Sequence, residues 1–134
     1  MKGLSRVSLS FSAGAVAGAV SGLLLFLCGA LGLMQSYGVK MAPVLTPPWL
    51  YQRVVWGGLF GLLFVLPLLE RSPWFVRGIV ISLIPTLVHY FIVFPLVLKQ
   101  GVFGLQLGDF TPYFVAFFNL VWGLVAAWWL RLTS

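Results

Sequence analysis

Residues 74–98 read WFVRGIVISLIPTLVHYFIVFPLVL, and this stretch decides the fold class. Between Arg77 and Lys99 it contains no Asp, Glu, Lys or Arg, and the only histidine of the chain, His89, lies near its middle. About 20 consecutive apolar residues are needed for an α-helix to cross about 30 Å of hydrocarbon. The stretch therefore predicts a membrane-spanning helix that carries one ionisable group at depth.

The composition of the whole chain agrees with a lipid environment. Of its 134 residues, 61% are hydrophobic and 7% are charged, and the mean hydropathy is +1.08. A soluble domain carries about 25% charged residues. The net charge of +6 comes from scattered lysines and arginines rather than from a basic stripe, which argues against nucleic acid as a partner. The single cysteine, Cys28, excludes an internal disulfide.

Four apolar stretches predict a single all-α membrane domain over residues 1–134. We expect four transmembrane helices, at about 10–36, 48–69, 74–98 and 112–131. The last three are preceded by Thr46-Pro47-Pro48, Ser72-Pro73 and Thr111-Pro112. Each of these motifs offers a hydroxyl for the helix cap and a proline for the first turn, where the missing N–H has no helical partner in any case.

The basic residues predict the orientation of these spans. With four spans, both termini lie on one side of the membrane, and that side holds five basic residues against three on the other. The five are Lys2, Arg6, Arg71, Arg77 and Arg131, and the three are Lys40, Arg53 and Lys99. Because cytoplasmic loops carry the excess of Lys and Arg, we expect both termini in the cytoplasm.

Small residues predict how the helices pack. Gly14, Gly18 and Gly22 recur at a spacing of four residues, and small residues on one helix face let two backbones approach closely in lipid. Two interpretations are open: contact with another helix of the same chain, or a self-association seam between protomers. The other glycines expected at helix contacts are Gly57, Gly61 and Gly123.

The second and fourth predicted spans resemble each other at an offset of 66 residues. Arg53, Gly57 and Gly61 correspond to Asn119, Gly123 and Ala127, and Val-Trp-Gly occurs at 55–57 and again at 121–123. The first and third spans show no comparable match at that offset. A true repeat would relate two parallel hairpins about an axis along the membrane normal. Chance in an apolar chain explains the similarity equally well.

The third span carries its polar and helix-breaking residues on one face. They are Gly78, Ser82, Pro85 and His89, with Thr86 beside them. Pro85 cannot donate a backbone hydrogen bond and should kink the helix, and the nearby hydroxyls can satisfy freed carbonyls. His89 and Asn119 are expected at the same depth, close enough for a hydrogen bond.

Three interpretations of His89 compete: a neutral structural histidine, a member of a proton or solute path, and an axial ligand of haem or a chlorophyll-type pigment. Arg53 can extend toward the headgroups, and Asp109 is its expected acidic partner. The two acids, Glu70 and Asp109, fall on opposite sides of the predicted membrane. We therefore expect no catalytic carboxylate pair, no catalytic residues, no metal site and no enzymatic activity.

The segment Val88 to Leu96 (VHYFIVFPL), followed by Leu-Val-Trp at 120–122 and a basic end at Arg131, resembles the C-terminal half of YagU-like bacterial inner-membrane proteins. Residues 17–21 (AGAVS) are similar to the first helix of that family. The resemblance implies an integral inner-membrane protein and singles out His89 and Pro95. It implies no established reaction.

The expected function is that of a small integral membrane protein that acts by helix packing. It would work as a homo-oligomer or as an accessory or assembly subunit of a larger membrane complex, with the bilayer and other membrane subunits as partners. The alternative is a minimal oligomeric transporter or channel for a small solute or protons, lined by His89, Asn119 and Ser82. A lipid-binding scaffold is a third interpretation. No cofactor is expected apart from the haem or pigment alternative.

Overall fold

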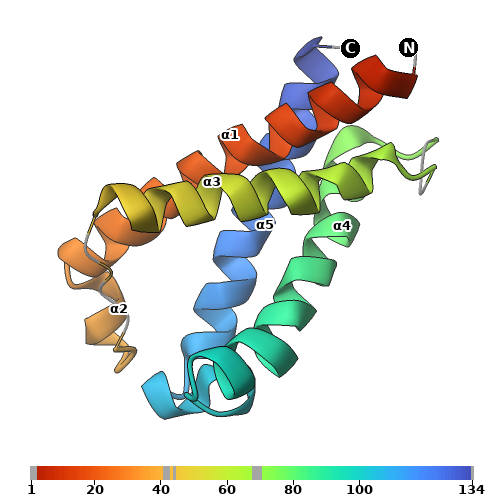
Figure 1. Ribbon diagram of the computed structural model, residues 1–134. Coiled ribbons are helices and arrows are strands. Elements are labelled where there is room, and N and C mark those ends of the chain that lie inside the picture. Colours follow the sequence, from red (N-terminus) through yellow and green to blue (C-terminus); the bar gives the residue numbers. More distant parts are fainter. Residues whose placement is uncertain (1–2, 41–42, 44, 68–70, 134) are drawn as a thin grey trace.

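The computed structural model describes residues 3–40, 43, 45–67 and 71–133, and the regular secondary structure of these residues is entirely helical (Figure 1). The long helices are α1 (Gly3–Ala30), α3 (Pro47–Gly61), α4 (Trp74–Val88) and α5 (Thr111–Thr133). The shorter ones are α2 (Leu33–Ser36), the 3₁₀-helix η1 (Leu62–Val65), the π-helix η2 (His89–Val97) and the 3₁₀-helix η3 (Val102–Leu107). No strand occurs in the described residues, and the all-α prediction is confirmed.

Two antiparallel helical hairpins form the bundle (Figure 1). The first is α1 with α3, the second is α4 with α5, and α1 packs against α5, so that the order across the molecule is α3, α1, α5, α4. The end that carries both chain termini is called the terminal end here, and the opposite end, with α2 and η3, is called the loop end. Helices α3 and α4 approach each other at the terminal end and diverge toward the loop end, and α3 hardly touches α4.

Within the described part of the chain, three helical segments are long and apolar enough to cross a membrane: Gly3–Ala30, Trp74–Val97 and Thr111–Thr133. The second predicted span differs from expectation, because α3 has 15 residues and then tightens into the four residues of η1. Helical structure thus ends at Val65 instead of 69, and residues 68–69 lie outside the described part of the chain, as do Lys2 and Glu70.

The first predicted span, 10–36, is also divided. Helix α1 begins earlier, at Gly3, and ends at Ala30. Gly32 follows with φ of +77°, in the left-handed region that glycine adopts without a steric penalty. The chain therefore turns at Gly32, and the short α2 begins after it.

The predicted hydroxyl caps are present at one of the three helix starts. The Trp49 N–H donates to Thr46 Oγ1 at 3.4 Å, as expected for α3. In α4 the cap residue is Pro73, and no side chain caps the helix. Thr111 is the first residue of α5 itself, and its buried Oγ1 has no hydrogen-bond partner in the described residues.

The predicted irregularity of the third span lies one turn beyond Pro85. Pro85 is inside α4, which continues as an α-helix to Val88, and the Thr86 hydroxyl donates to the Ser82 carbonyl at 2.8 Å. From His89 onward the wider π-helix η2 takes over and includes Pro95. The helix type therefore changes at His89, and the ring of this residue is carried by the first position of the wider helix.

Glycines mark the crossing point of each hairpin. A Cβ added to Gly14 would lie 2.7 Å from Cα of Gly61 and still closer to the Gly57 carbonyl oxygen. In the second hairpin, a Cβ added to Gly78 would lie 2.7 Å from the Gly123 carbonyl oxygen. Backbones at such distances leave no room for a methyl group. In this structure the glycines of α1 therefore contact another helix of the same chain.

The two crossings occupy equivalent positions in the two halves of the chain. Gly57 and Gly123 are 66 residues apart, which is the offset at which the second and fourth predicted spans resemble each other. Gly14 and Gly78 are 64 residues apart. At the offset of 64 residues, Gly18 corresponds to Ser82. The Cβ of Ser82 would lie 2.8 Å from a Cβ added to Gly123. The correspondence thus extends to both helices of each hairpin. The first and third spans show no match at an offset of 66 residues because their offset is 64 residues.

Candidate functional site

His89 is the first residue of η2, and its ring is held by the preceding turn. Its Nδ1 lies 2.7 Å from the Pro85 carbonyl oxygen. Because a carbonyl oxygen can only accept, Nδ1 carries the proton in this arrangement, and Nε2 keeps its lone pair. No hydrogen-bond partner for Nε2 is found among the residues that the structure describes. The imidazole is therefore presented as an acceptor.

Asn119 of α5 lies beside His89. The side chain is 7% exposed, and its Nδ2 is 3.5 Å from His89 Nδ1. A protonated Nδ1 cannot accept from an amide N–H, so the opposite assignment of the amide, with Oδ1 facing Nδ1–H, gives the better electrostatic contact. The structure thus brings together the two polar residues that the sequence places at one depth.

The hydroxyls of Ser82 and Thr86 serve α4 itself. Ser82 Oγ donates to the Ile79 carbonyl at 2.6 Å, and Thr86 Oγ1 donates to the Ser82 carbonyl at 2.8 Å. Both side chains are buried. Bonds of this kind satisfy a hydroxyl inside its own helix, so neither residue joins His89 and Asn119 in a polar contact.

Arg53 of α3 approaches the same region from the other hairpin. Its aliphatic stem would lie 3.3 Å from a Cβ added to Gly22. Its guanidinium lies over the Trp49 ring, with 5.9 Å between Cζ and the ring centroid. The guanidinium is also near enough to His89 to interact with it electrostatically. Among the described residues it forms no ion pair with Asp109, which is exposed in the turn before α5. The ion pair expected between Arg53 and Asp109 is thus not formed in this conformation.

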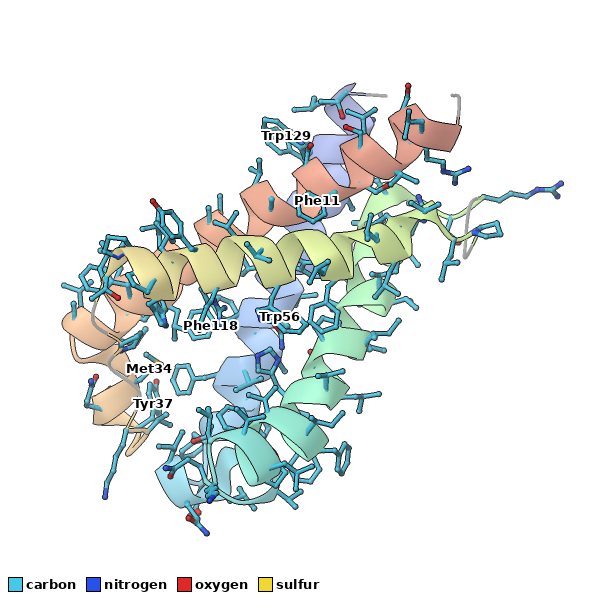
Figure 2. All side chains as sticks on the ribbon, in the orientation of Figure 1. Phe11, Met34, Tyr37, Trp56, Phe118 and Trp129 are labelled. Atoms are coloured by element: carbon cyan, nitrogen blue, oxygen red, sulfur yellow. The ribbon has the colours of Figure 1, made fainter. Side chains whose placement is uncertain are left out.

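A tryptophan missed as a site residue joins the two hairpins. Trp122 of α5 is 4% exposed, and its Nε1–H donates to the Gly14 carbonyl at 3.1 Å. Its counterpart at the 66-residue offset, Trp56 of α3, is 58% exposed. Figure 2 shows Trp56 projecting from α3 into the region between α3 and the second hairpin. The repeated Val-Trp-Gly motif marks both residues in the sequence, but no local signal tells which of them is buried.

No protein family, curated protein or solved structure matches this chain. Within the described ranges, no group of three or more His, Cys, Asp or Glu side chains could hold a metal ion. His89 alone could accept one proton or one hydrogen bond through Nε2, or occupy one axial position of a haem or pigment metal. This site can therefore accept a proton or a hydrogen bond through one oriented imidazole, which lies near the amide of Asn119 and the guanidinium of Arg53.

Proposed function

We propose that α3 and η1 together form a second membrane span, which makes the protein a four-span one. Fifteen α-helical residues and four 3₁₀ residues give a length of about 30 Å, the thickness of the hydrocarbon core. Both termini would then lie on one side, and the distribution of Lys and Arg favours the cytoplasm. The resemblance to YagU-like proteins supports the bacterial inner membrane as the location.

Cysteine accessibility tests this topology. In a Cys28→Ser background, Gln35→Cys and Gln100→Cys should react with a membrane-impermeant maleimide from the outside of intact cells, and Ser72→Cys should not. If α3 does not span the membrane, positions 35 and 72 lie on the same side, and the two variants would react alike.

Within this topology we propose that the protein works by lateral helix packing, without enzymatic chemistry of its own, as a homo-oligomer or an accessory subunit. The observation that carries this proposal is Trp56. It lies near the middle of α3 and η1, is 58% exposed, and its indole N–H has no partner among the described residues. Tryptophan favours the membrane interface, and an indole N–H in hydrocarbon without an acceptor costs free energy. A protein surface that offers an acceptor removes this cost.

Native mass spectrometry of the protein, extracted gently from its own membrane, tests the packing role. We expect a homo-oligomer or a complex with other membrane subunits, and Trp56→Phe should lower the assembled fraction. Trp128→Phe is the matched control, because Trp128 is also exposed, at 47%, but lies near the terminal end. A monomer in the wild type, or equal loss in the two variants, would contradict the proposal.

The orientation of His89 favours a second candidate function, a minimal oligomeric transporter or channel for protons or a small solute. Ionisable groups within spans mark such paths by default, and Nε2 is free to accept a proton beside Asn119 and Arg53. Proteoliposomes with a pH-sensitive dye inside would show proton flux. His89→Gln should abolish this flux and leave the assembled fraction unchanged, whereas Trp56→Phe should lower assembly first.

A further inference from the structure

Arg53 is the basic side chain of α3, and it has no acidic partner among the residues that the structure describes. The side chain is half-buried, and its contacts are the Trp49 ring, the glycine face of α1 at Gly22 and the electrostatic interaction with His89. None of these contacts carries a negative charge. Charged side chains within membrane spans are costly and commonly pair with another group. Arg53 therefore presents a cation that the single chain does not neutralise in this conformation.

Asp109 has the complementary charge and is also without a partner. It is exposed in the turn before α5, and its side chain forms no ion pair or hydrogen bond within the described ranges. The chain has two acidic residues in total, and the other, Glu70, falls on the opposite side of the membrane in the four-span topology. Asp109 is therefore the acid of this chain that shares the side of Arg53.

The two charges lie at the same end of the molecule. Helices α3 and α5 both begin at the loop end (Figure 1), and Asp109 comes just before α5. The guanidinium of Arg53 lies over the ring of Trp49, which is one turn nearer to the start of α3, so its charge is directed toward the loop end. A two-fold axis along the membrane normal leaves every group at its own depth. Arg53 of one copy and Asp109 of a second copy can therefore meet at one level of the bilayer.

The surface around Arg53 is the one on which the packing role depends. Trp56 is three residues further along α3, and residues three apart are neighbours on a helix surface. Gln52, four residues before Trp56, is exposed on the same side of the helix. We propose that two copies of this chain form a two-fold dimer through this face of α3, in which Arg53 of each copy pairs with Asp109 of the other.

This inference rests on the packing function proposed above and names the partner as a second copy. In a two-fold interface each contact occurs twice, so one kind of ion pair neutralises both guanidiniums and both carboxylates. Arginine suits this contact because its planar fork matches the geometry of a carboxylate.

A mixture of two charge-reversed variants tests the ion pair. Arg53→Asp carries an acid at positions 53 and 109, and Asp109→Arg carries a base at both, so neither variant can form a complementary pair with itself. A dimer with one chain of each kind restores both pairs. We expect each variant alone to dimerise at least about tenfold more weakly than the wild type, since bonds to charged groups are the stronger ones. Native mass spectrometry of the co-expressed variants in mild detergent should show mixed dimers well above the half that random pairing gives.

Lys99→Asp is the matched control, because Lys99 is an exposed basic residue at the same end and the change of charge is the same. Alone it should dimerise as the wild type does, and with Asp109→Arg it should give no excess of mixed dimers. Asp109→Arg alters an exposed turn residue without contacts in the described structure, so its weaker dimerisation cannot come from a damaged fold.

Each alternative result overturns the inference in a recognisable way. If Arg53→Asp loses the dimer and Asp109→Arg keeps it, the guanidinium pairs with another anion, such as a lipid phosphate or an acid of a different subunit. If the dimer returns only when both changes are made in one chain, the pair is intramolecular. If Trp56→Phe lowers the assembled fraction and neither charge variant does, the packing role stands and the ion pair is wrong. A monomeric wild type overturns the packing role and the ion pair together.

Discussion

Replacing Gly14 by alanine should separate α1 from α3 at the point where the first hairpin is tightest. The new Cβ would lie 2.7 Å from Cα of Gly61, whereas ordinary contact begins at 3.4 Å, so the backbones must move apart by about 0.7 Å at that atom. The Gly57 carbonyl is closer still and is backbone, which cannot rotate away. Overpacking of this kind costs about 1–3 kcal/mol. The shift also strains the bond from Trp122 to the Gly14 carbonyl.

Gly22→Ala is the matched control, because it lies in the same helix and gains the same helix propensity of about 1 kcal/mol. The three atoms nearest to its Cβ all belong to the Arg53 side chain, at 3.3 Å and beyond, and that flexible chain can move. We therefore expect Gly14→Ala to be less stable than Gly22→Ala by about 1–3 kcal/mol. Equilibrium unfolding in mixed micelles, followed by circular dichroism as the fraction of sodium dodecyl sulfate rises, measures the difference. If both variants unfold at the same detergent fraction, α1 and α3 do not cross at Gly14.

Three further predictions concern single contacts and use the same unfolding assay. Trp122→Phe removes the bond to Gly14 and should cost about 1 kcal/mol; no loss would mean that the indole N–H is not bonded. Arg77→Gln removes the guanidinium from the two carbonyls at the end of η1 and should cost about 1.5–3 kcal/mol, with an unchanged midpoint as the refuting result. Gly104→Ala should destabilise more than Gly38→Ala: both have positive φ, but only at Gly104 would the Cβ meet neighbours, within 3.0 Å.

The fold class could be predicted from the sequence because it depends on the hydropathy and length of whole apolar stretches, and not on single residues. The limits of the helices depend on local geometry, and there the predictions were less accurate. A hydropathy pattern does not predict that Gly32 takes a left-handed conformation, or that the chain forms a 3₁₀-helix after Gly61. The Pro85 position shows the same limit, since the helix accommodates that proline and changes type only at His89.

Helix periodicity predicts which residues of the candidate site lie near one another. Depth and face place His89 near Asn119, and the two lie in contact. The sequence predicts that hydroxyls near Pro85 bond to carbonyls of their own helix, but periodicity does not say which carbonyl each group selects. Ser82 and Thr86 donate to the carbonyls of Ile79 and Ser82, and His89 bonds to that of Pro85. Charge alone predicts Asp109 as the partner of Arg53, but the turn that carries Asp109 leaves its side chain exposed.

The correspondence between the hairpins explains why α3 and α4 diverge at the loop end. The seam between α1 and α5 is closed there by buried Leu25 and Phe118, in one apolar cluster. At the offsets of 64 and 66 residues, the same positions of the other seam hold His89 and Gln52. Closing α3 onto α4 in the same way would bury two polar side chains against each other, at a desolvation cost that the apolar pair does not bear. The seam stays open at this depth, and Trp56 remains uncovered beside it. The exposed tryptophan that carries the packing proposal thus lies beside a seam whose facing positions are polar, whereas the equivalent seam holds an apolar pair.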